Sequence, residues 1–335
     1  MNSDLKISLD LMGGDNGPQA VIPAAINILQ KDSSIKLTLV GLPEAIEQAK
    51  SCFGEKYKEK ISYIEASEVV SMQDDPIEAL RRKKKSSLRL AIEEVKYNRV
   101  DACVSSGNTG ALMATAKYLL GMIPGVDRPA IVSAIPSIKG TVFMLDLGAN
   151  INSTPSNLFQ FAVMGSIISK GISGINKPRV ALLNVGEEEI KGNDLVKDTA
   201  KLLSNSNLNY VGFIEGNDIF NNNADVVVTD GFVGNISLKS MEGVANLISY
   251  YIKKEFSLSF YRKLQFFLAK PSMNEIRKKL DSRQYNGATL VGLNGIVVKS
   301  HGHSDSLAFE SAVNIAIIEA RKNLPSEIKE FIDKL

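Results

Sequence analysis

Residues 224–239 read ADVVVTDGFVGNISLK and join an expected strand, a glycine-rich turn and the start of a helix. Residues 224–229 form a short, β-branched and almost wholly apolar run, which is typical of a strand buried on both faces. The turn 230–235 follows, and an amphipathic helical pattern begins at Ile236. A buried strand that leads through such a turn into a helix presents backbone N–H groups and the positive end of a helix dipole. The stretch therefore predicts a site for an anion such as phosphate.

Three residues of this turn are candidates for the site. Asp230 stands at the carboxyl end of the strand, where open α/β sheets bind their ligands. Gly231 and Gly234 let a ligand approach the backbone closely, or supply a positive φ.

Four other apolar runs end in similar turns. Residues 7–10 lead to MGGDNGP, residues 101–105 to SGNTG, residues 142–147 to GAN, and residues 180–184 to VGEEE. One such turn is weak support for a site, because helix caps and tight turns use the same residues. Five turns, each after an apolar strand, predict one site built from many strand ends.

Strand and helix patterns alternate along the whole chain. The expected strands cover residues 6–10, 36–40, 61–64, 100–104, 130–135, 141–147, 179–183, 210–214, 224–229 and 295–299. The expected helices cover residues 18–30, 43–51, 76–97, 109–120, 155–169, 194–203, 234–254, 273–280 and 306–321. This alternation predicts a three-layer α/β/α fold of the Rossmann-like kind, with a mostly parallel sheet. We expect residues 1–335 to form a single large α/β domain, with a helical and aromatic protrusion over residues 240–285.

Composition narrows the class of protein. The 335 residues include 44% hydrophobic and 23% charged residues, which is ordinary for a globular protein. The net charge is only +2, so we do not expect a basic surface that binds nucleic acid. Cys52 and Cys103 lie in unrelated contexts, which favours a reducing compartment. The first strand begins at once without a signal-peptide pattern, and no apolar run is long enough to span a bilayer. We therefore expect a cytoplasmic protein.

Few residues carry recognisable catalytic chemistry. The two histidines, His301 and His303, lie in a Gly/Ser loop, where they either bind phosphate and move a proton or belong to a helix-capping loop with Ser304. The chain has no metal-binding Cys/His spacing, no nucleophile elbow and no P-loop, and the MGGD turn does not match a dinucleotide fingerprint. We expect no metal and no cofactor.

Seven blocks together carry a family resemblance. They are LDLMGGDNGP (9–18), ACVSSGNTGALM (102–113), MLDLGAN (144–150), NVGEEEIKGN (184–193), the stretch 224–239, LVGLNG (290–295) and HGHS (301–304). These blocks resemble the signature of the bacterial phosphate acyltransferases, also called acyl-acyl carrier protein:phosphate acyltransferases. The resemblance covers nearly the whole chain and implies the fold of the isocitrate/isopropylmalate dehydrogenase and phosphotransacetylase type.

The resemblance implies that inorganic phosphate attacks the thioester of an acyl-acyl carrier protein and forms an acyl phosphate. The product would pass to a membrane glycerol-3-phosphate acyltransferase in phospholipid synthesis. Phosphate is already an anionic nucleophile and a thiolate is a fair leaving group, so the reaction needs positioning and oxyanion stabilisation more than a strong base.

The expected site follows from these blocks. Lys191, Asn235 and His301 are the expected catalytic residues, through positive charge, a proton or an amide donor. Asp10 and other strand-end carboxylates are expected to order the loops. The residues expected to contact or shape the substrate site are Gly13, Gly14, Asp15, Gly107, Asn108, Thr109, Asp146, Asn150, Asp230, Gly231, Gly234 and Ser304.

Two surface segments suggest partners. The basic run 81–85 (RRKKK) either docks an acidic carrier protein or is a solvated helix face. Residues 255–270 (EFSLSFYRKLQFFLAK) combine aromatic and basic side chains, which favours peripheral contact with a membrane surface over a helix pair in a homodimer, although both can hold.

Three other functions remain open at this point. A phosphotransacetylase-like enzyme would use an acyl-CoA thioester, because residues 230–236 also resemble that family's turn. A decarboxylating dehydrogenase would need nicotinamide and a metal, and the sequence shows no convincing motif for either. A non-catalytic membrane scaffold would bind carrier protein whether or not phosphate is present.

Overall fold

The computed structural model of the protein describes residues 4–280 and 282–334, and omits the side chains of residues 260, 272, 274, 276–280, 282 and 284. The expected domain 1–335 and the expected protrusion 240–285 therefore include positions 1–3, 281 and 335, which lie outside the described residues.

The described chain builds one sheet of 11 strands in the order β3-β2-β1-β4-β11-β10-β5-β6-β9-β7-β8. The strands are β1 Leu5–Asp10, β2 Ile35–Gly41, β3 Ile61–Glu65, β4 Ala102–Ser105, β5 Ala130–Ser137, β6 Gly140–Leu145, β7 Arg179–Leu183, β8 Asn209–Ile214, β9 Val226–Val228, β10 Ala288–Val291 and β11 Ile296–Lys299. Most neighbours are parallel, as predicted, because helices connect them. The pairs β11·β10, β10·β5 and β5·β6 are antiparallel and reverse the strand direction in the middle of the sheet.

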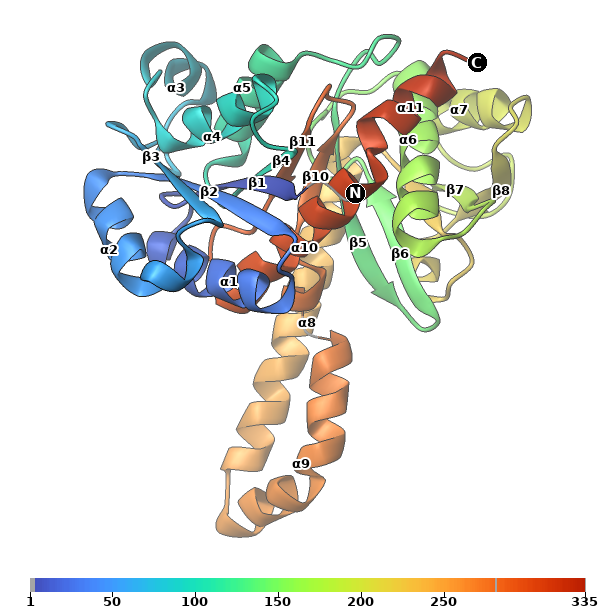
Figure 1. The fold of residues 1–335 in the computed structure, drawn as a ribbon. Coiled ribbons are helices and arrows are strands. Elements are labelled where there is room, and N and C mark those ends of the chain that lie inside the picture. The colour runs from blue at the N-terminus through green and yellow to red at the C-terminus, as the bar shows by residue number, and fades with distance from the viewer. Residues whose placement is uncertain (1–3, 281, 335) are drawn as a thin grey trace.

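Helices cover both faces of the sheet (Figure 1). They are α1 Gly17–Lys31, α2 Pro43–Phe53, α3 Pro76–Arg82, α4 Ser87–Lys96, α5 Thr109–Leu120, α6 Pro155–Ser173, α7 Asp194–Ser204, α8 Gly231–Ser257, α9 Phe260–Leu280, α10 Ser306–Lys322 and α11 Leu324–Ile332. Side chains of α4, α5 and α8 pack in one apolar core on one face. The other face has two apolar cores, one under α1, α2 and α10 and one under α6, α7 and α11. This arrangement confirms the predicted three-layer α/β/α class.

Because the strand direction reverses, the carboxyl ends of β11 and β6 lie at nearly the same level across the sheet. Lys299, the last residue of β11, pairs with Ala288 of β10, and Ala288 pairs with Ser133 of β5. Ser133 in turn pairs with Met144, one residue before the end of β6. The carboxyl ends of β11 and β6 therefore face the same zone from opposite directions, separated by three strand spacings of about 4.8 Å each.

The structure differs from the sequence-based prediction in four places. Helix α9 begins at Phe260, well before the helix expected over 273–280. The helix expected over 76–97 is broken after Arg82, because Lys83–Ser86 turn before α4 begins at Ser87. Strand β10 was not predicted, although its antiparallel pairing joins the two halves of the sheet. Helix α11 was also missed, and it buries Leu324 and Ile328 against α6.

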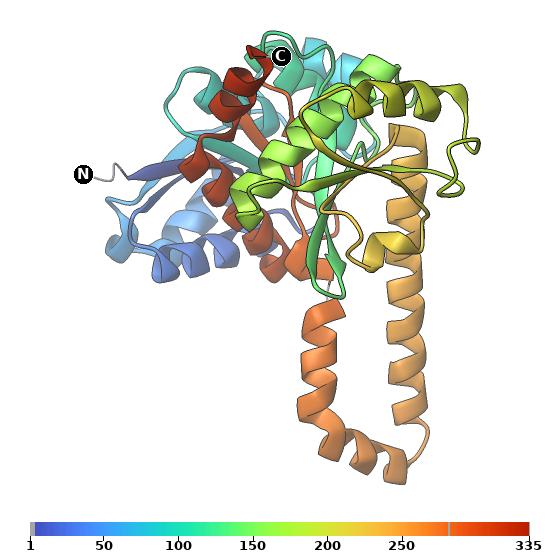
Figure 2. The same cartoon turned by 90° about the vertical axis from the view of Figure 1, so that its right-hand side faces the viewer.

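Helices α8 and α9 project from the body as a long hairpin, which lies below the body in Figures 1 and 2. The two helices contact each other. Among the described residues, no helix combines the length and the apolar character needed to cross a membrane.

Candidate functional site

The loops after β1, β4 and β11 meet at the carboxyl ends of these adjacent strands, and we call this group the β4 cluster. Asp10 lies at its base and is 1% exposed. Its carboxylate accepts hydrogen bonds from the Ser105 hydroxyl at 2.7 Å and from the Met12 N–H at 3.0 Å. The Ser105 oxygen also accepts the Gly107 N–H at 3.0 Å. Burial raises the pKa of the Asp10 carboxyl, which supports the turn from below rather than facing a ligand.

The turn after β1 holds the other two loops through close backbone contacts. A Cβ on Gly13 would lie 2.6 Å from the nitrogen of Gly107. Gly14 has a φ of +73°, and a Cβ there would lie 2.5 Å from the carbonyl oxygen of Gly302. Asp15 donates its N–H to the same oxygen at 2.9 Å. Glycine at 13 and 14 is thus required for the loops to meet.

Helix α5 begins in this cluster with open hydrogen-bond donors. The backbone N–H groups of Asn108, Thr109 and Gly110 have no partner within the part of the chain that the structure describes. The Asn108 side chain is not open, because its oxygen accepts the Ala111 N–H at 3.0 Å and its NH₂ group donates to carbonyls of residues 71–74. Asn108 therefore offers its backbone to a ligand, and unpaired N–H groups at a helix start suit an anion.

Lys299 supplies a buried cation beside these N–H groups. It is 8% exposed, and its Nζ donates to the Ser106 carbonyl at 3.2 Å and to the Ser300 carbonyl. Burial, together with the charge of Lys239, lowers the pKa of Lys299 to about 8. The sequence analysis missed Lys299, although a lysine that ends an otherwise apolar strand is a visible signal.

The charge of Lys239 on α8 also acts on His301. Burial, followed by the charge of Lys239, lowers the pKa of His301. The His303 N–H donates to His301 Nδ1 at 3.4 Å, which places the proton on Nε2. Lys239 has one carboxylate partner, Glu242 at 2.8 Å. Lys299 thus lies near the start of α5, and the charge of Lys239 acts on both Lys299 and His301.

The rest of the β11 loop supports this arrangement. Ser304 is buried, and its hydroxyl oxygen accepts bonds from the Ser300 hydroxyl at 2.9 Å and from the Asn286 amide at 3.3 Å. His303 is exposed and its Nδ1 contacts the Asp15 carboxylate. Ser304 and Asp15 therefore shape the loop through bonds inside the protein.

A second group of predicted residues follows β6 and β9, and we call it the β9 cluster. Asp146 is fully buried there. It accepts the backbone N–H groups of Ile131 at 2.9 Å, Ala149 at 3.0 Å and Asn150 at 2.7 Å, and the Asn150 amide at 3.0 Å. Burial raises the pKa of Asp146 and these donors oppose the rise. The carboxylate orders the loop after β6.

The start of α8 is fully hydrogen-bonded. Asp230 caps the helix by accepting the N–H groups of Phe232 at 2.9 Å and Val233 at 3.0 Å. The Gly234 N–H reaches the Asp230 carbonyl, and the Gly231 N–H reaches a carbonyl of the loop after β6, both at 2.9 Å. Phosphate binding at the start of α8 stays a prediction, because the N–H groups there would have to give up their present hydrogen bonds to bind phosphate. The N–H groups at the start of α5 are open.

Helix α8 joins the two clusters. A Cβ on Gly234 would lie 1.9 Å from the Asp146 carbonyl oxygen, so α8 starts in contact with the backbone of the β9 cluster. Asn235 is exposed and lies beside Gly148. Lys239 is four residues further on, about 6 Å along the helix axis, and its charge acts on the β4 cluster.

Lys191 lies on the loop after β7, the strand next to β9. Its Nζ pairs with Glu188 at 2.7 Å, and its side chain is 43% exposed. The Asn184 amide closes this loop on the carbonyls of Gly186 at 3.0 Å and Lys191 at 3.3 Å. No hydrogen bond or ion pair joins Lys191 to either cluster within the described residues.

The predicted residues therefore fall into two groups and one separate lysine. The β4 cluster contains Gly13, Gly14, Asp15, Gly107, Asn108, Thr109, His301 and Ser304. The β9 cluster contains Asp146, Asn150, Asp230, Gly231, Gly234 and Asn235.

Comparison with known proteins places this arrangement in a family. The sequence pattern described as "Fatty acid synthesis protein" matches residues 5–327. The "Phosphate acyltransferase" of Alkalilimnicola ehrlichii is 51% identical over 335 residues, which cover 100% of this chain and 98% of that protein. The "Phosphate acyltransferase" of Coxiella burnetii is 52% identical over 331 residues, covering 97% of this chain and 95% of that protein.

Solved structures share the fold at low identity. A phosphotransacetylase from Streptococcus pyogenes matches with a TM-score of 0.63 and 17% identity, over 96% of this chain and 95% of that one. A branched-chain phosphotransacylase from Enterococcus faecalis matches with a TM-score of 0.59 and 14% identity, over 94% of this chain and 99% of that one. These two likenesses concern the fold alone.

Proposed function

The chain belongs to the fatty acid synthesis protein family, and on this premise we propose that it moves a fatty acyl group from acyl-acyl carrier protein to inorganic phosphate. Family membership makes the chain an acyltransferase with phosphate as the acyl acceptor. The carrier protein as donor, and the residues assigned below, are the added proposal. The acyl phosphate would then serve a membrane glycerol-3-phosphate acyltransferase.

The observation that carries the placement of phosphate is the open start of α5 beside Lys299. The N–H groups of Asn108, Thr109 and Gly110 are unpaired among the described residues, and the buried Lys299 ammonium lies beneath the same turn. Lys239 adds a second positive charge at the β4 cluster. Unpaired donors together with two cations favour a phosphate over a neutral ligand.

The reaction then needs little acid–base chemistry. A phosphate oxygen attacks the thioester carbonyl carbon, a C–O bond forms, and the C–S bond breaks to release the carrier thiolate. The protein fixes the phosphate beside the thioester, which removes the entropic cost of bringing the reactants together. An amide or N–H donor aimed at the carbonyl oxygen stabilises its developing charge.

Three side chains have proposed roles in this step. Asn235 is exposed at the start of α8, and its amide would donate to the oxyanion. His301 carries its proton on Nε2, from which it would donate to phosphate or to the departing sulfur. Lys191 would add positive charge once its Glu188 partner is exchanged for substrate.

The test uses purified protein, a long-chain acyl-acyl carrier protein and inorganic phosphate. Free carrier thiol and hydroxylamine-trappable acyl phosphate are followed together, and both should appear only with phosphate. Thiol release without phosphate would identify a thioesterase. Turnover with acyl-CoA but not with acyl-acyl carrier protein would favour a phosphotransacetylase-like enzyme. No turnover with either donor would favour a non-catalytic binding scaffold.

The basic run 81–85 is the proposed docking surface for the carrier. Arg81, Arg82, Lys84 and Lys85 are exposed at the end of α3 and in the turn before α4. The single carboxylate paired with these four, among the described residues, is Glu78, which lies 3.6 Å from Arg82. A surface with unpaired positive charge attracts an acidic partner and speeds its association.

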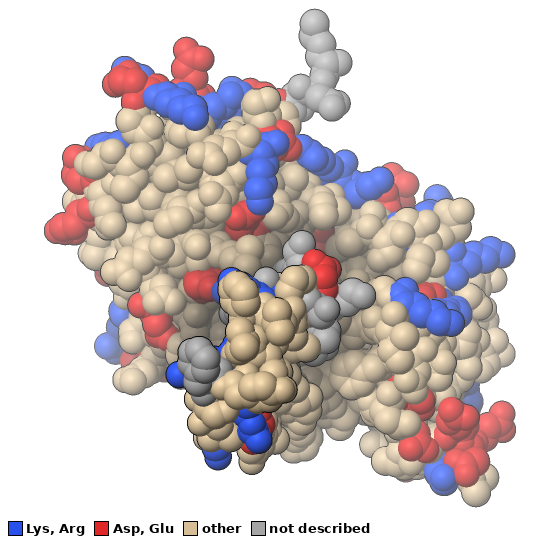
Figure 3. All heavy atoms as spheres, turned by 90° about the horizontal axis from the view of Figure 1, so that it is seen from below, with Lys and Arg blue, Asp and Glu red and all other residues tan. Residues whose placement is uncertain are grey.

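Residues 255–270, at the tip of the α8–α9 hairpin, are the proposed membrane contact. Figure 3 looks onto this tip, where uncharged side chains predominate and a few basic groups lie at the edge. Tyr261, Phe267 and Leu268 are each about two-thirds exposed or more, while the Phe260 side chain lies outside the described residues. Aromatic groups beside Arg262 and Lys263 suit the headgroup region of an anionic membrane. This proposal places the enzyme at the cytoplasmic face of the membrane.

Exposed apolar residues on α8, between the body and the tip of the hairpin, support a proposed homodimer. Val244, Leu247, Ile248 and Tyr251 are about half exposed and recur at intervals of three or four residues on α8. A second copy of the chain would bury this stripe and leave the two tips free for the membrane.

A further inference from the structure

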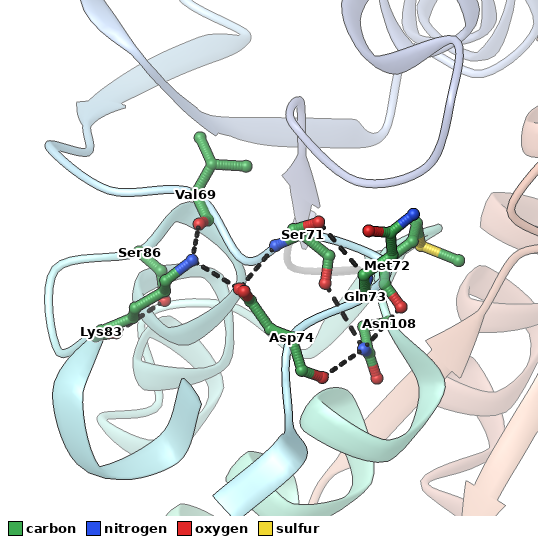
Figure 4. A network of polar contacts seen from close by, with 8 residues as sticks. All are labelled: Val69, Ser71, Met72, Gln73, Asp74, Lys83, Ser86 and Asn108. Atoms are coloured by element: carbon green, nitrogen blue, oxygen red, sulfur yellow. Dashed lines mark hydrogen bonds and ion pairs between the residues drawn. The ribbon is translucent and has the colours of Figure 1, made fainter. Parts of the chain in front are cut away.

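Residues 69–74, which we call the strap, connect β3 to α3 and lie against the start of α5 (Figure 4). The Asn108 NH₂ group donates to the carbonyl oxygens of Met72 and Asp74, both at 3.0 Å, and approaches that of Ser71 at 3.4 Å. The Asn108 oxygen caps α5 at the same time. One side chain thus ties the strap to the helix whose free N–H groups form the proposed phosphate site.

Lys83 holds the strap from the other side. Its Nζ donates to the Val69 carbonyl at 2.8 Å and forms an ion pair with Asp74 (Figure 4). The Asp74 carboxylate also accepts the Ser71 N–H at 2.8 Å. The bond from Lys83 lowers the pKa of Asp74. Within the basic run, Lys83 is the residue that turns inward, while its four neighbours are exposed.

The strap also reaches the β11 loop. Met72 is 44% exposed, and a Cβ on Gly302 would lie 3.0 Å from the Met72 Cε. Gly302 follows His301, so the strap runs from the basic run to the edge of the β4 cluster. The strap is therefore the first segment that a thioester arm would contact if it entered from a partner docked on the basic run.

We propose that the strap selects the acyl donor by positioning the thioester arm of a docked carrier protein, with Lys83 and Asn108 as its positioning residues. The inference rests on the proposed carrier-dependent function. A carrier that contacts Arg82 and Lys84 restrains Lys83 between them, and through Asp74 it restrains the strap. A small thioester makes no contact with the basic run and gains nothing from this restraint, so the two donor classes should respond differently to a loosened strap.

The experiment compares Lys83→Met and Asp74→Asn with the wild type, using acyl-acyl carrier protein and an acyl thioester of N-acetylcysteamine as donors. We expect kcat with the carrier donor to fall roughly tenfold in both variants, because a small displacement of a reactive group costs this much or more. Turnover with the small thioester should stay within about twofold of wild type. Lys83→Arg should recover most of the carrier-dependent rate, since it restores the ion pair.

Two control variants isolate the strap. Lys84→Met removes the same charge from the basic run without touching the strap, so it should weaken carrier binding and raise KM rather than lower kcat. Lys201→Met breaks a lysine–aspartate pair on α7, far along the chain from the strap, and should behave as wild type. Equal loss of kcat with both donors, or no loss in either strap variant, would overturn the proposal.

Hydrogen exchange gives a second measurement that does not depend on small-donor turnover. Backbone exchange over residues 69–75 should slow when carrier protein binds the wild type, and should not slow in Lys83→Met. Unchanged exchange in the wild type on carrier binding would also overturn the proposal. A wild type without phosphate-dependent thiol release would instead refute the proposed function, which separates the two failures.

Discussion

Asn235 and Lys239 lie one helical turn apart on α8, and each belongs to a different group of site residues. Asn235 lies beside Gly148 in the β9 cluster. Burial, followed by the charge of Lys239, lowers the pKa of both His301 and Lys299 in the β4 cluster. The oxyanion donor and the phosphate-binding cation that we propose are thus fixed on one rigid element, about 6 Å apart along its axis.

Lys239→Met should raise KM for phosphate about tenfold, because one close positive charge on an anion is worth about 1.4 kcal/mol. The donor KM should change less. Lys239 holds the pKa of His301 down, so its removal should raise that pKa, which the imidazole resonances report in an NMR titration. Lys253→Met, further out on the same helix, serves as the control for net charge. An equal rise in KM in both variants would mean that phosphate responds only to overall charge.

Asn235→Ala, His301→Ala and Lys191→Ala should each lower kcat with carrier donor and phosphate. We expect losses of about 100-fold for Asn235, as for other oxyanion donors, and about tenfold to 100-fold for His301 through general acid catalysis. Lys191→Ala should also lower turnover, because it removes a positive charge. Steady-state rates of acyl phosphate formation measure this, and wild-type turnover in all three variants would refute the assigned roles.

Gly234→Ala should destabilise the protein by about 3 kcal/mol, in the range of overpacked interiors. A Cβ at this position would lie 1.9 Å from the Asp146 carbonyl oxygen, which is backbone and cannot rotate away. Gly243→Ala is the matched control on the same helix, since no atom lies within 4 Å of its Cβ position. That change should stabilise α8 by about 0.5–1 kcal/mol. Chemical denaturation measures both, and equal values would contradict the close approach of α8.

Glu319→Gln should make stability less sensitive to pH. Burial raises the pKa of Glu319 to about 7 from an ordinary value of 4.5, so the native state keeps a proton that the unfolded state releases between these values. Wild-type stability therefore falls as pH rises through this window, by about 3 kcal/mol in total. Glutamine still accepts the hydrogen bond from Thr289, which is 2.6 Å long, and carries no ionisable group.

The free energies of unfolding of wild type and Glu319→Gln should thus diverge from pH 5 to about pH 7, and the variant should stay more stable at pH 8. Glu330→Gln changes an exposed carboxylate of α11 and should give no such divergence. A constant difference between Glu319→Gln and wild type across this range would contradict the prediction.

Phe266→Asp combined with Phe267→Asp should abolish sedimentation with anionic liposomes and leave turnover in solution intact. Both side chains are exposed near the tip of the hairpin, where a charge opposes insertion into the headgroup region. Tyr97→Asp, at an exposed position on the body, should keep liposome binding. Retained binding of the double variant would refute membrane contact through residues 255–270.

Most of the fold followed from periodicity. Apolar runs identified ten of the strands, because burial on both faces selects β-branched residues regardless of neighbours. Strand β10, Ala288–Val291, was missed, and its place in the sheet is set by antiparallel pairing with β5, which is distant in the chain. The break between α3 and α4 was missed because the lysines at 83–85 are compatible with a helix. The turn is set by the bond that Lys83 donates to the Val69 carbonyl and by the Glu68 carboxylate, which accepts the Lys85 N–H.

The sequence indicated candidate site residues by type but not by role. Glycine turns and strand-end carboxylates are local features, and the structure brings the loops that carry them into two clusters. The sequence did not show that Asp230 saturates the start of α8 while α5 keeps its donors open. Nor did it show Lys299 beneath the α5 turn, because that contact joins positions almost 200 residues apart.

The position of β10 and β11 in the sheet has a consequence for how the molecule is made. These elements come from the end of the chain yet fill the gap between β4 and β5. On the ribosome, the nascent chain therefore carries an open strand edge on β4 until nearly the whole sequence has emerged. His301 and Lys299 arrive with the same segment. Translation that stops early leaves a chain that is exposed to aggregation and also lacks Lys299 at the proposed phosphate site.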